Sequence, residues 1–292
     1  MPVFACLLPF GHFYKPAAWA NLSAPVLAVH WVRVPCLPNP SARTSPARDG
    51  FEKFPLKYRA MILAAGLGAR MRPLTDHTPK PLLDVAGRPM VFWQIASLVK
   101  AGFVDIAINT SVHSTQWIQA IGNGRRFGAR ITLHHEGDAP LETLGGIRAM
   151  VSDFSADHEA DRTPFVAVSG DVFTDFDYGS LVPVLQKIEA GEVDAHFVLA
   201  DNPPFHLAGD FAIRGGLATR TGQRLNFAGI TCWHPKVFRD LPVGKHERLF
   251  PWADALVEND RVSAEHYRGR WENIGTPSQL ASLRHRLGAK MT

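Results

Sequence analysis

Cysteine is scarce in this chain, which has three among its 292 residues. Cys6, Cys36 and Cys232 lie far apart and form no Cys-x-x-Cys pattern. Such sparing use fits a reducing compartment, so we expect a protein of the cytoplasm. The thirteen histidines include no His-Glu-x-x-His pattern, so zinc-dependent catalysis has no support.

Long apolar runs are also missing. Residues 3–10 are too few to span a membrane, and no basic residue precedes them as in a secretory signal. The chain has a net charge of +4, but residues 1–57 account for it with six bases and two acids. Residues 58–292 hold 25 of each, so they lack the charge excess of a nucleic-acid-binding face. We therefore expect neither a membrane nor a nucleic acid as a partner.

What the chain does have is a glycine-containing loop directly after a short apolar run. Residues 60–63 predict a buried strand; Gly66 and Gly68 follow, then Arg70 and, ten residues later, Lys80. Glycine permits positive φ angles and close approach of the backbone, so N–H groups can point at phosphate oxygens beside the two cations. The loop therefore predicts a polyphosphate site. It is neither a Walker A loop, since no Gly-Lys-Ser/Thr follows, nor a dinucleotide fingerprint, since the third glycine is missing.

Residues 63–75, followed by 78–82, closely resemble the signature of the sugar nucleotidyltransferases, which runs from Leu-Ala-Ala-Gly-x-Gly-x-Arg to Pro-Lys-Pro. The resemblance implies that the loop wraps a nucleoside triphosphate, that Arg70 neutralises the leaving pyrophosphate and that Lys80 sits at the reacting phosphates. Many members have threonine where this chain has Ala69, a minor departure. The nucleotide-binding residues that we predict are Ala65, Gly66, Gly68, Ala69, Arg70, Lys80, Gly145 and Gly146.

Apolar runs and helical periods alternate from residue 59 onward and predict an α/β fold. We expect strands at 60–63, 105–109, 130–134, 164–168 and 195–199, and helices at 90–101, 116–121, 144–151 and 178–190. This order predicts a Rossmann-like, mostly parallel sheet with helices on both faces, as in nucleotidyltransferases and the related A-type glycosyltransferases. Short strands near 210–213, 225–233 and 262–267 and a helix at 249–258 predict a smaller sugar-binding lobe on the same sheet.

These patterns divide the chain into an N-terminal extension, residues 1–57, and a nucleotidyltransferase domain, residues 58–288. The domain comprises a nucleotide-binding half, 58–200, and a sugar-binding half, 201–288. The extension has no acid before Asp49 and no sustained period, so we expect it to be poorly structured. An organellar transit peptide or a start set upstream of the true one explains this composition; members of the resembled family usually begin near residues 58–61, which favours the second.

Asp171 follows the apolar run that ends at residue 168, which places it on the same rim as the glycine loop. Phosphoryl transfer uses a divalent cation, and Mg²⁺ prefers carboxylate oxygens and substrate phosphates. Residues 271–277 resemble the family's Trp-x-Asp-Ile-Gly-Thr-Pro, whose aspartate implies a second metal ligand, but this chain has Asn273 there. An amide oxygen still coordinates Mg²⁺. The substitution also leaves open a regulatory homologue that binds nucleotide without catalysis. We predict Arg70, Lys80 and Asp171 as catalytic residues.

Later segments of the sequence indicate the base of the nucleotide and the sugar of the second substrate. Gly145 and Gly146 open a helix and favour a pyrimidine in a tight slot, with Thr143 as the helix cap. Further strings between residues 141 and 271 resemble the uridylyltransferases that act on N-acetylmuramate 1-phosphate in peptidoglycan recycling. The resemblance implies UTP and a sugar 1-phosphate as substrates; another hexose 1-phosphate, with another base, remains open. The sequence does not give the oligomeric state. The sugar-substrate residues that we predict are Glu142, Ser169, Asp210 and Gly229.

Overall fold

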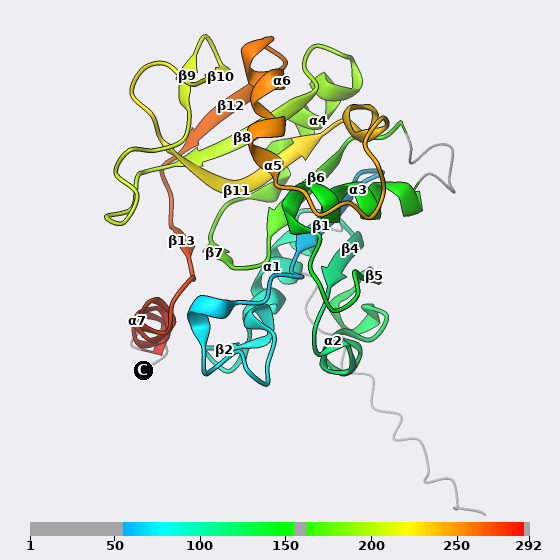
Figure 1. Ribbon diagram of the computed structural model, residues 1–292, viewed down its shortest axis with the longest axis vertical. Helices are drawn as coiled ribbons and strands as arrows, with labels where there is room; N and C mark the ends of the chain where they lie inside the picture. Colours follow the sequence, from blue (N-terminus) through cyan, green and yellow to red (C-terminus); the bar gives the residue numbers. More distant parts are fainter. Residues whose placement is uncertain (1–54, 155–161, 289–292) are drawn as a thin grey trace, which may run out of the picture. The chain divides into compact units, whose positions relative to one another are not determined.

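The structure is a computed structural model that describes residues 55–154 and 162–288. Its centre is a nine-stranded sheet in which only β10 and β11 run against the other strands (Figure 1). The sheet is thus mixed and mostly parallel, which confirms the predicted fold class. In spatial order the strands are β5 (Arg130–His135), β4 (Asp105–Thr110), β1 (Arg59–Leu63), β6 (Phe165–Ser169), β11 (Asn226–Trp233), β8 (Ala195–Ala200), β12 (Val262–Tyr267), β10 (Leu217–Thr219) and β9 (Ala212–Arg214).

Strand β1 shows why a continuous apolar run forms part of this sheet. It pairs in parallel with β4 on one edge and with β6 on the other. Ala60, Met61 and Ile62 are fully buried, with Met61 in the core on one face and the other two in the core on the opposite face. Because successive side chains of a strand point to opposite faces, a strand covered on both faces needs apolar residues throughout.

Helices cover both faces of the sheet, as predicted. α1, α2 and α4 pack in the core that contains Ala60 and Ile62, whereas α3, α5 and α6 pack in the core that contains Met61. The third cluster of buried apolar residues joins α7 to the segment after the glycine loop. The helices are α1 (Met90–Lys100), α2 (Ser114–Ile121), α3 (Glu142–Phe154), α4 (Val182–Glu189), α5 (Leu249–Trp252), α6 (Asp254–Glu258) and α7 (Pro277–Gly288).

Several elements differ from their predicted bounds. The helix expected at 178–190 begins as the 3₁₀ turn η4 (Tyr178–Leu181), and only then continues as α4. The helix expected at 249–258 is interrupted at Phe250, whose ψ of 136° is extended. α7 and the antiparallel pair β7 (Val172–Thr174) with β13 (Trp271–Asn273) were not predicted. Neither were β10 or the small pair β2 (Asp84–Val85) with β3 (Arg88–Pro89).

The two predicted halves share one sheet. β11, from the second half, lies between β6 and β8 of the first half and pairs with both in antiparallel. Of the predicted extension, residues 1–54 lie outside the described residues, whereas Leu56 N already donates to Gly102 O at 2.9 Å. Among the residues described, no helix has the length and apolarity that crossing a membrane requires.

Candidate active site

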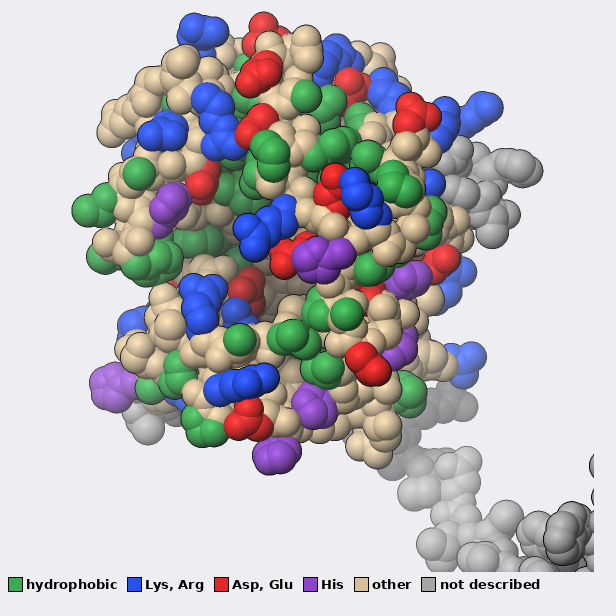
Figure 2. Space-filling view, in the orientation of Figure 1, with side chains coloured by type: hydrophobic (Ala, Val, Ile, Leu, Met, Phe, Trp, Pro, Cys, Tyr) green, Lys and Arg blue, Asp and Glu red, His purple; other side chains and the backbone are tan. Residues whose placement is uncertain are grey.

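The carboxyl ends of β1, β4 and β6 meet at a cavity of about 490 Å³, each strand contributing its end residue or a neighbour of it. This is where an open α/β sheet binds ligands. In the space-filling view the face of the molecule is hollowed between its upper and lower parts, with basic and acidic side chains around the hollow (Figure 2). The cavity is lined by residues 63–70, Lys80, Pro81, Asn109, Glu136, Pro140, Glu142, Thr143, Ser169, Asp171, His246 and Gly275.

The glycine loop is folded against the segment that carries Lys80. Gly68 has a φ of +64° and precedes the 3₁₀ turn η1 (Ala69–Met71). Thr75 Oγ1 donates to Gly68 O at 2.9 Å, and a Cβ on Gly68 would stand 3.1 Å from Lys80 Cβ. Any larger residue at position 68 therefore meets both a positive φ and its neighbours. Glycine at this position brings the backbone of the glycine loop next to the lysine.

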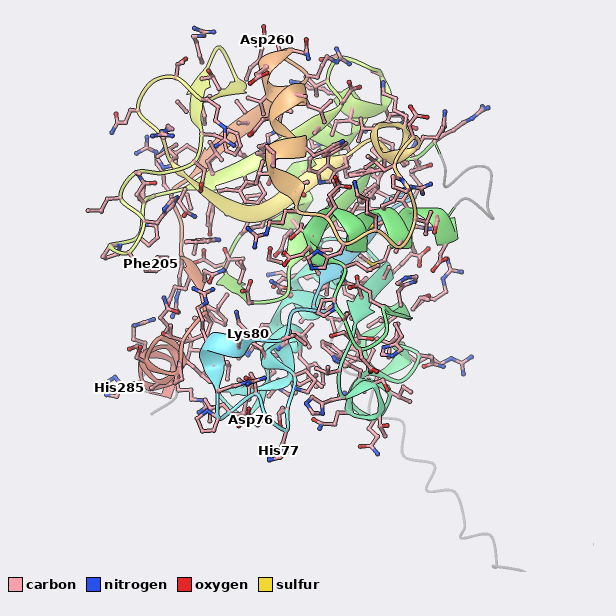
Figure 3. All side chains as sticks on the ribbon, viewed as in Figure 1. Asp76, His77, Lys80, Phe205, Asp260 and His285 are labelled. Carbon is pink, nitrogen blue, oxygen red and sulfur yellow. The ribbon has the colours of Figure 1, made fainter. Side chains whose placement is uncertain are left out.

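Lys80 and Asp171, two of the predicted catalytic residues, form an ion pair. Lys80 Nζ donates to Asp171 Oδ2 at 2.6 Å, and the lysine side chain is 10% exposed. Lys80 opens the 3₁₀ turn η2 (Lys80–Leu82) and is labelled on that turn in Figure 3. A lysine confined in this way loses little further conformational freedom when a phosphate binds beside it. The pair puts a cation and a carboxylate together in the cavity.

The turn that presents Asp171 is clamped by Gln94, a residue that the sequence analysis did not identify. Gln94 lies in α1, is 3% exposed and donates from Nε2 to Ser169 O at 2.6 Å and to Val172 O at 2.9 Å. Gly170 N donates to Leu63 O at 2.8 Å. One side-chain amide thus holds both carbonyls that flank the Gly170–Asp171 turn. This fixes the backbone position from which the Asp171 side chain extends.

Asn273 lies near this turn, because β13 pairs with β7 so that Asn273 is opposite Val172 and Ile274 N donates to Asp171 O at 2.9 Å. The atoms Asn273 Oδ1 and Arg70 Nη2 each lie 3.3 Å from the position of a Cβ built on Gly275. A carboxylate and an amide oxygen from adjoining backbone segments are hard donors of the kind Mg²⁺ prefers, so the donor types fit this ion. Within the described part of the chain, no group of three or more His, Cys, Asp or Glu residues could hold a metal.

The first turn of α3 reaches the cavity through Glu142 and Thr143, whereas Gly145 and Gly146 are buried outside its lining. Gly145 N donates to Glu247 O at 3.2 Å, and a Cβ on Gly145 would stand 2.2 Å from Lys245 O. Both glycines are required by close packing, and their contact with a base stays a prediction. Thr143 lies within the helix, which begins one residue earlier, so its predicted capping position is wrong.

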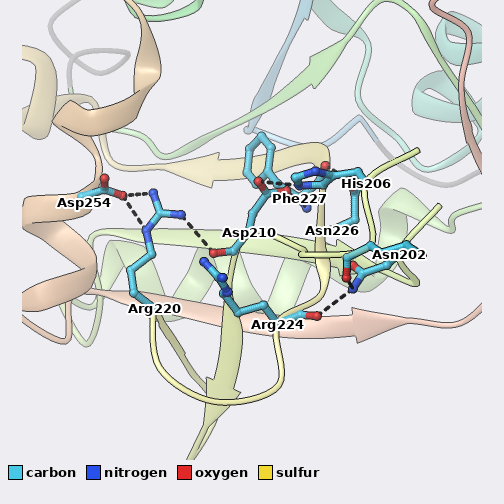
Figure 4. A network of polar contacts seen from close by, with 9 residues as sticks. Asn202, His206, Asp210, Arg220, Arg224, Asn226, Phe227 and Asp254 are labelled. Carbon is cyan, nitrogen blue, oxygen red and sulfur yellow. Dashed lines mark hydrogen bonds and ion pairs between the residues drawn. The ribbon is translucent and has the colours of Figure 1, made fainter. Parts of the chain in front are cut away.

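Of the predicted sugar-substrate residues, Glu142 and Ser169 line the cavity, whereas Gly229 and Asp210 do not. Gly229 has a φ of +69° at an irregularity in β11, and a Cβ there would stand 2.6 Å from Ser169 Oγ. Asp210 lies in the network of Figure 4, with Oδ1 3.0 Å from His206 Nε2 and Oδ2 accepting from Phe227 N at 2.8 Å. Both carboxylate oxygens of Asp210 are therefore already hydrogen-bonded to other groups of the protein.

Asn109 and Glu136 are cavity residues that the sequence analysis missed. Asn109 Nδ2 donates to Glu136 Oε1 at 2.7 Å, and Asn109 Oδ1 accepts from Ala64 N at 2.6 Å. Glu136 Oε2 accepts from Leu141 N at 2.8 Å. The pair ties the start of the glycine loop to the segment before α3. Its signal in the sequence is the position of each residue at or just after the end of a predicted strand.

Comparisons with known proteins identify the family of this chain. A family model described as nucleotidyl transferase matches residues 59–205. The N-acetylmuramate alpha-1-phosphate uridylyltransferase of Neisseria meningitidis serogroup B is 36% identical over 235 residues, which cover 79% of this chain and 99% of that protein. The catalytic subunit beta of mannose-1-phosphate guanylyltransferase from Drosophila pseudoobscura pseudoobscura is 29% identical over 80% of this chain, which spans 65% of that relative.

Solved structures share the fold at low sequence identity. A Bacillus anthracis protein assigned as a glucose-1-phosphate thymidylyltransferase, crystallised with a sucrose, has a TM-score of 0.66 and 19% identity and covers 78% of this chain and 94% of its own. HddC from Yersinia pseudotuberculosis, complexed with GMP-PN, has a TM-score of 0.62 and 19% identity and covers 79% and 99%. On the family model and the 36% identical relative, this chain belongs to the nucleotidyl transferase family and is a nucleotidyltransferase.

Proposed function

We propose that this enzyme transfers UMP from UTP to N-acetylmuramate 1-phosphate, giving UDP-N-acetylmuramate and pyrophosphate, and that it does so in the cytoplasm as part of peptidoglycan recycling. The observation that carries the substrate is the uridylyltransferase of Neisseria meningitidis, 36% identical over 99% of its own length. The chemistry is supported by the cavity that brings together the glycine loop, Arg70, Lys80 and Asp171.

The reaction needs no general base, because the phosphate of the sugar is already anionic. One of its oxygens forms a bond to the α-phosphorus of UTP while the bond to the pyrophosphate oxygen breaks on the opposite side. Lys80, confined beside Asp171, neutralises charge where the two phosphates meet, and Arg70 neutralises the departing pyrophosphate. The backbone N–H groups around Gly66 and Gly68 orient the triphosphate for this displacement.

Asp171 and Asn273 are the residues that would hold Mg²⁺, which when bound supplies positive charge to the phosphate oxygens. Asp171 has its Oδ2 engaged by Lys80, so binding of the ion must share or displace that contact. Asn273→Asp adds a carboxylate at this position. We expect it to keep turnover and to lower the Mg²⁺ concentration that gives the half-maximal rate, as a Mg²⁺ titration of the initial rate measures. Complete loss of turnover would give Asn273 another role.

Mannose-1-phosphate guanylyl transfer is the second candidate, favoured by the relatives of 26 to 29% identity. A panel of UTP, dTTP and GTP against N-acetylmuramate, N-acetylglucosamine, glucose and mannose 1-phosphates, read as pyrophosphate release, separates the two. We expect the fastest release from UTP with N-acetylmuramate 1-phosphate. Fastest release from GTP with mannose 1-phosphate would overturn the proposal, and no release from any pair would favour a regulatory, non-catalytic homologue.

A further inference from the structure

Two buried polar side chains lie at the carboxyl end of β4, Asn109 within the strand and Ser111 directly after it. They are 3% and 2% exposed. β4 lies beside β1, and the register of the two strands ends where Leu63 is paired with Asn109. Beyond Leu63 the chain leaves the sheet and enters the glycine loop, so its next backbone groups need partners outside the parallel ladder.

Asn109 and Ser111 supply these partners. Ala64 N donates to Asn109 Oδ1 at 2.6 Å, and Ser111 Oγ donates to Ala65 O at 2.6 Å. Ala64 and Ala65 are 4% and 5% exposed, so removal of either side chain takes a partner from a buried backbone group, which is unfavourable. The first two residues after β1 are thereby fixed.

The glycine loop is less enclosed from the next residue onward. A Cβ on Gly66 would have no atom within 4 Å, and Leu67 is 45% exposed. Both residues line the cavity. The enclosed start of the loop therefore ends at Ala65, and the residues after it extend into the cavity from that anchor.

Asn109 also holds a second part of the cavity lining, the segment between β5 and α3. Its Nδ2 donates to Glu136 Oε1 at 2.7 Å, and Glu136 Oε2 accepts from Leu141 N at 2.8 Å. A Cβ on Gly146 would stand 2.6 Å from both Asn109 Nδ2 and Glu136 Oε1, so glycine in α3 leaves room for this hydrogen bond. One side-chain amide thus connects the start of the glycine loop to the segment that contains Glu136.

We propose that Asn109 and Ser111 are positioning residues for the nucleoside triphosphate: they hold the glycine loop and the segment 136–141 at the separation that the bound nucleotide requires. Neither takes part in the bond change. A loop already fixed in its binding conformation loses less conformational entropy when the nucleotide binds, and its N–H groups are in place for the phosphates. The inference rests on the nucleotide site of the proposed function and is independent of the base and of the sugar.

The first test compares Ser111→Ala with Thr110→Val, which removes a hydroxyl from the neighbouring buried residue. Thr110 is 2% exposed, and its Oγ1 donates to His134 O at 3.5 Å, away from the glycine loop. The KM values of UTP and of N-acetylmuramate 1-phosphate are measured, each at saturating concentration of the other substrate. We expect Ser111→Ala to raise the KM of UTP about tenfold, the order for loss of one hydrogen bond to a buried group. The KM of the sugar phosphate, and both values in Thr110→Val, should stay within about twofold.

The second test reverses the hydrogen bond between Asn109 and Glu136. Asn109→Asp keeps an acceptor for Ala64 N but sets a second carboxylate against Glu136, and Glu136→Gln sets two amides against each other. Each single variant should raise the KM of UTP about tenfold. In the double variant the amide nitrogen at position 136 donates to the carboxylate at position 109, and the pair keeps the net charge of the wild type. We expect its KM for UTP to return to within about threefold of the wild-type value.

Additive losses in the double variant, equal rises in the KM of both substrates, or an unchanged KM of UTP in Ser111→Ala would overturn the proposal. Thermal melting of each variant shows whether it is folded. If Asn109→Asp melts below the assay temperature, Ser111→Ala against Thr110→Val decides. A wild type that releases pyrophosphate from GTP and not from UTP would overturn the proposed function, and the same comparisons with GTP would then test the two positioning residues.

Discussion

Lys80 is positioned by burial as well as by its ion pair, and this distinguishes it from the surface cations of the chain. Lys80→Ala removes a fixed charge from the centre of the proposed reaction. We expect kcat to fall about 10²- to 10³-fold, the range for loss of one preorganised donor. Pyrophosphate release at saturating substrate measures this, with Lys187→Ala, an exposed lysine of α4, as the control. Near wild-type turnover in Lys80→Ala would contradict the assignment.

Asp194 links pH to stability at a site remote from the chemistry. Its carboxylate accepts from Arg261 Nε at 2.8 Å and Nη2 at 3.0 Å and lies 2.7 Å from Lys236 Nζ. The hydrogen bonds from Arg261, helped by Lys236, outweigh desolvation and lower the pKa of Asp194 to about 2. A lowered pKa in the folded state stabilises the protein above the unfolded pKa, near 3.9, and this stabilisation is lost as the pH falls toward 2.

We therefore expect Asp194→Asn to lower the free energy of unfolding at neutral pH by about 2 kcal/mol and to flatten its decline between about pH 4 and 2. Urea denaturation across this range measures both effects. Asp240→Asn, an exposed aspartate of the same region, is the control. If the two variants gave the same curve, the network around Asp194 would not be a source of stability.

At the scale of elements, α1 acts on the site through Gln94. Its amide holds the carbonyls on both sides of the turn that carries Asp171. Gln94→Leu keeps the size of the side chain but leaves two buried carbonyls without their donor, which costs about 1 to 3 kcal/mol of stability. Because the turn then loosens, we expect kcat to fall about tenfold and the Mg²⁺ requirement to rise.

A Mg²⁺ titration of the initial rate, beside thermal melting, separates these effects. Gln186→Leu, an exposed glutamine of α4, is the control. A purely structural role would lower the melting temperature of Gln94→Leu and leave its Mg²⁺ titration as in the wild type.

The sequence predicted the elements whose apolar pattern is long or continuous, such as β1, β6 and α1. It also predicted the cavity residues of the glycine loop, because their order is local. It missed β7 and β13, since three-residue strands that pair across about a hundred residues leave no local period. The clamp by Gln94 was not predictable either, because an isolated glutamine in a helix looks like a surface residue. Asp210 lies in one of the sequence segments that resemble the uridylyltransferases, yet its carboxylate oxygens are engaged by His206 and by the backbone N–H of Phe227.

At the scale of the whole molecule, the described residues that line the cavity all lie at or after Leu63. Leu56 and Lys57 still contact the domain, the latter through Glu189 at 2.6 Å. A chain that starts at Pro55 should therefore keep kcat and KM within about twofold of the full chain, because it retains every lining residue that the structure describes. Steady-state kinetics on the two purified chains test this, and a chain that starts at Arg59, lacking both contacts, should melt at a lower temperature. A large loss of kcat in the chain from Pro55 would assign residues 1–54 a part in the reaction.

The position of β11 between β6 and β8 has a consequence for motion. A hinge between the two halves would have to break rows of backbone hydrogen bonds on both edges of β11, at a cost far above thermal energy. We therefore expect any opening and closing during turnover to take place in the segments around the rim of the cavity.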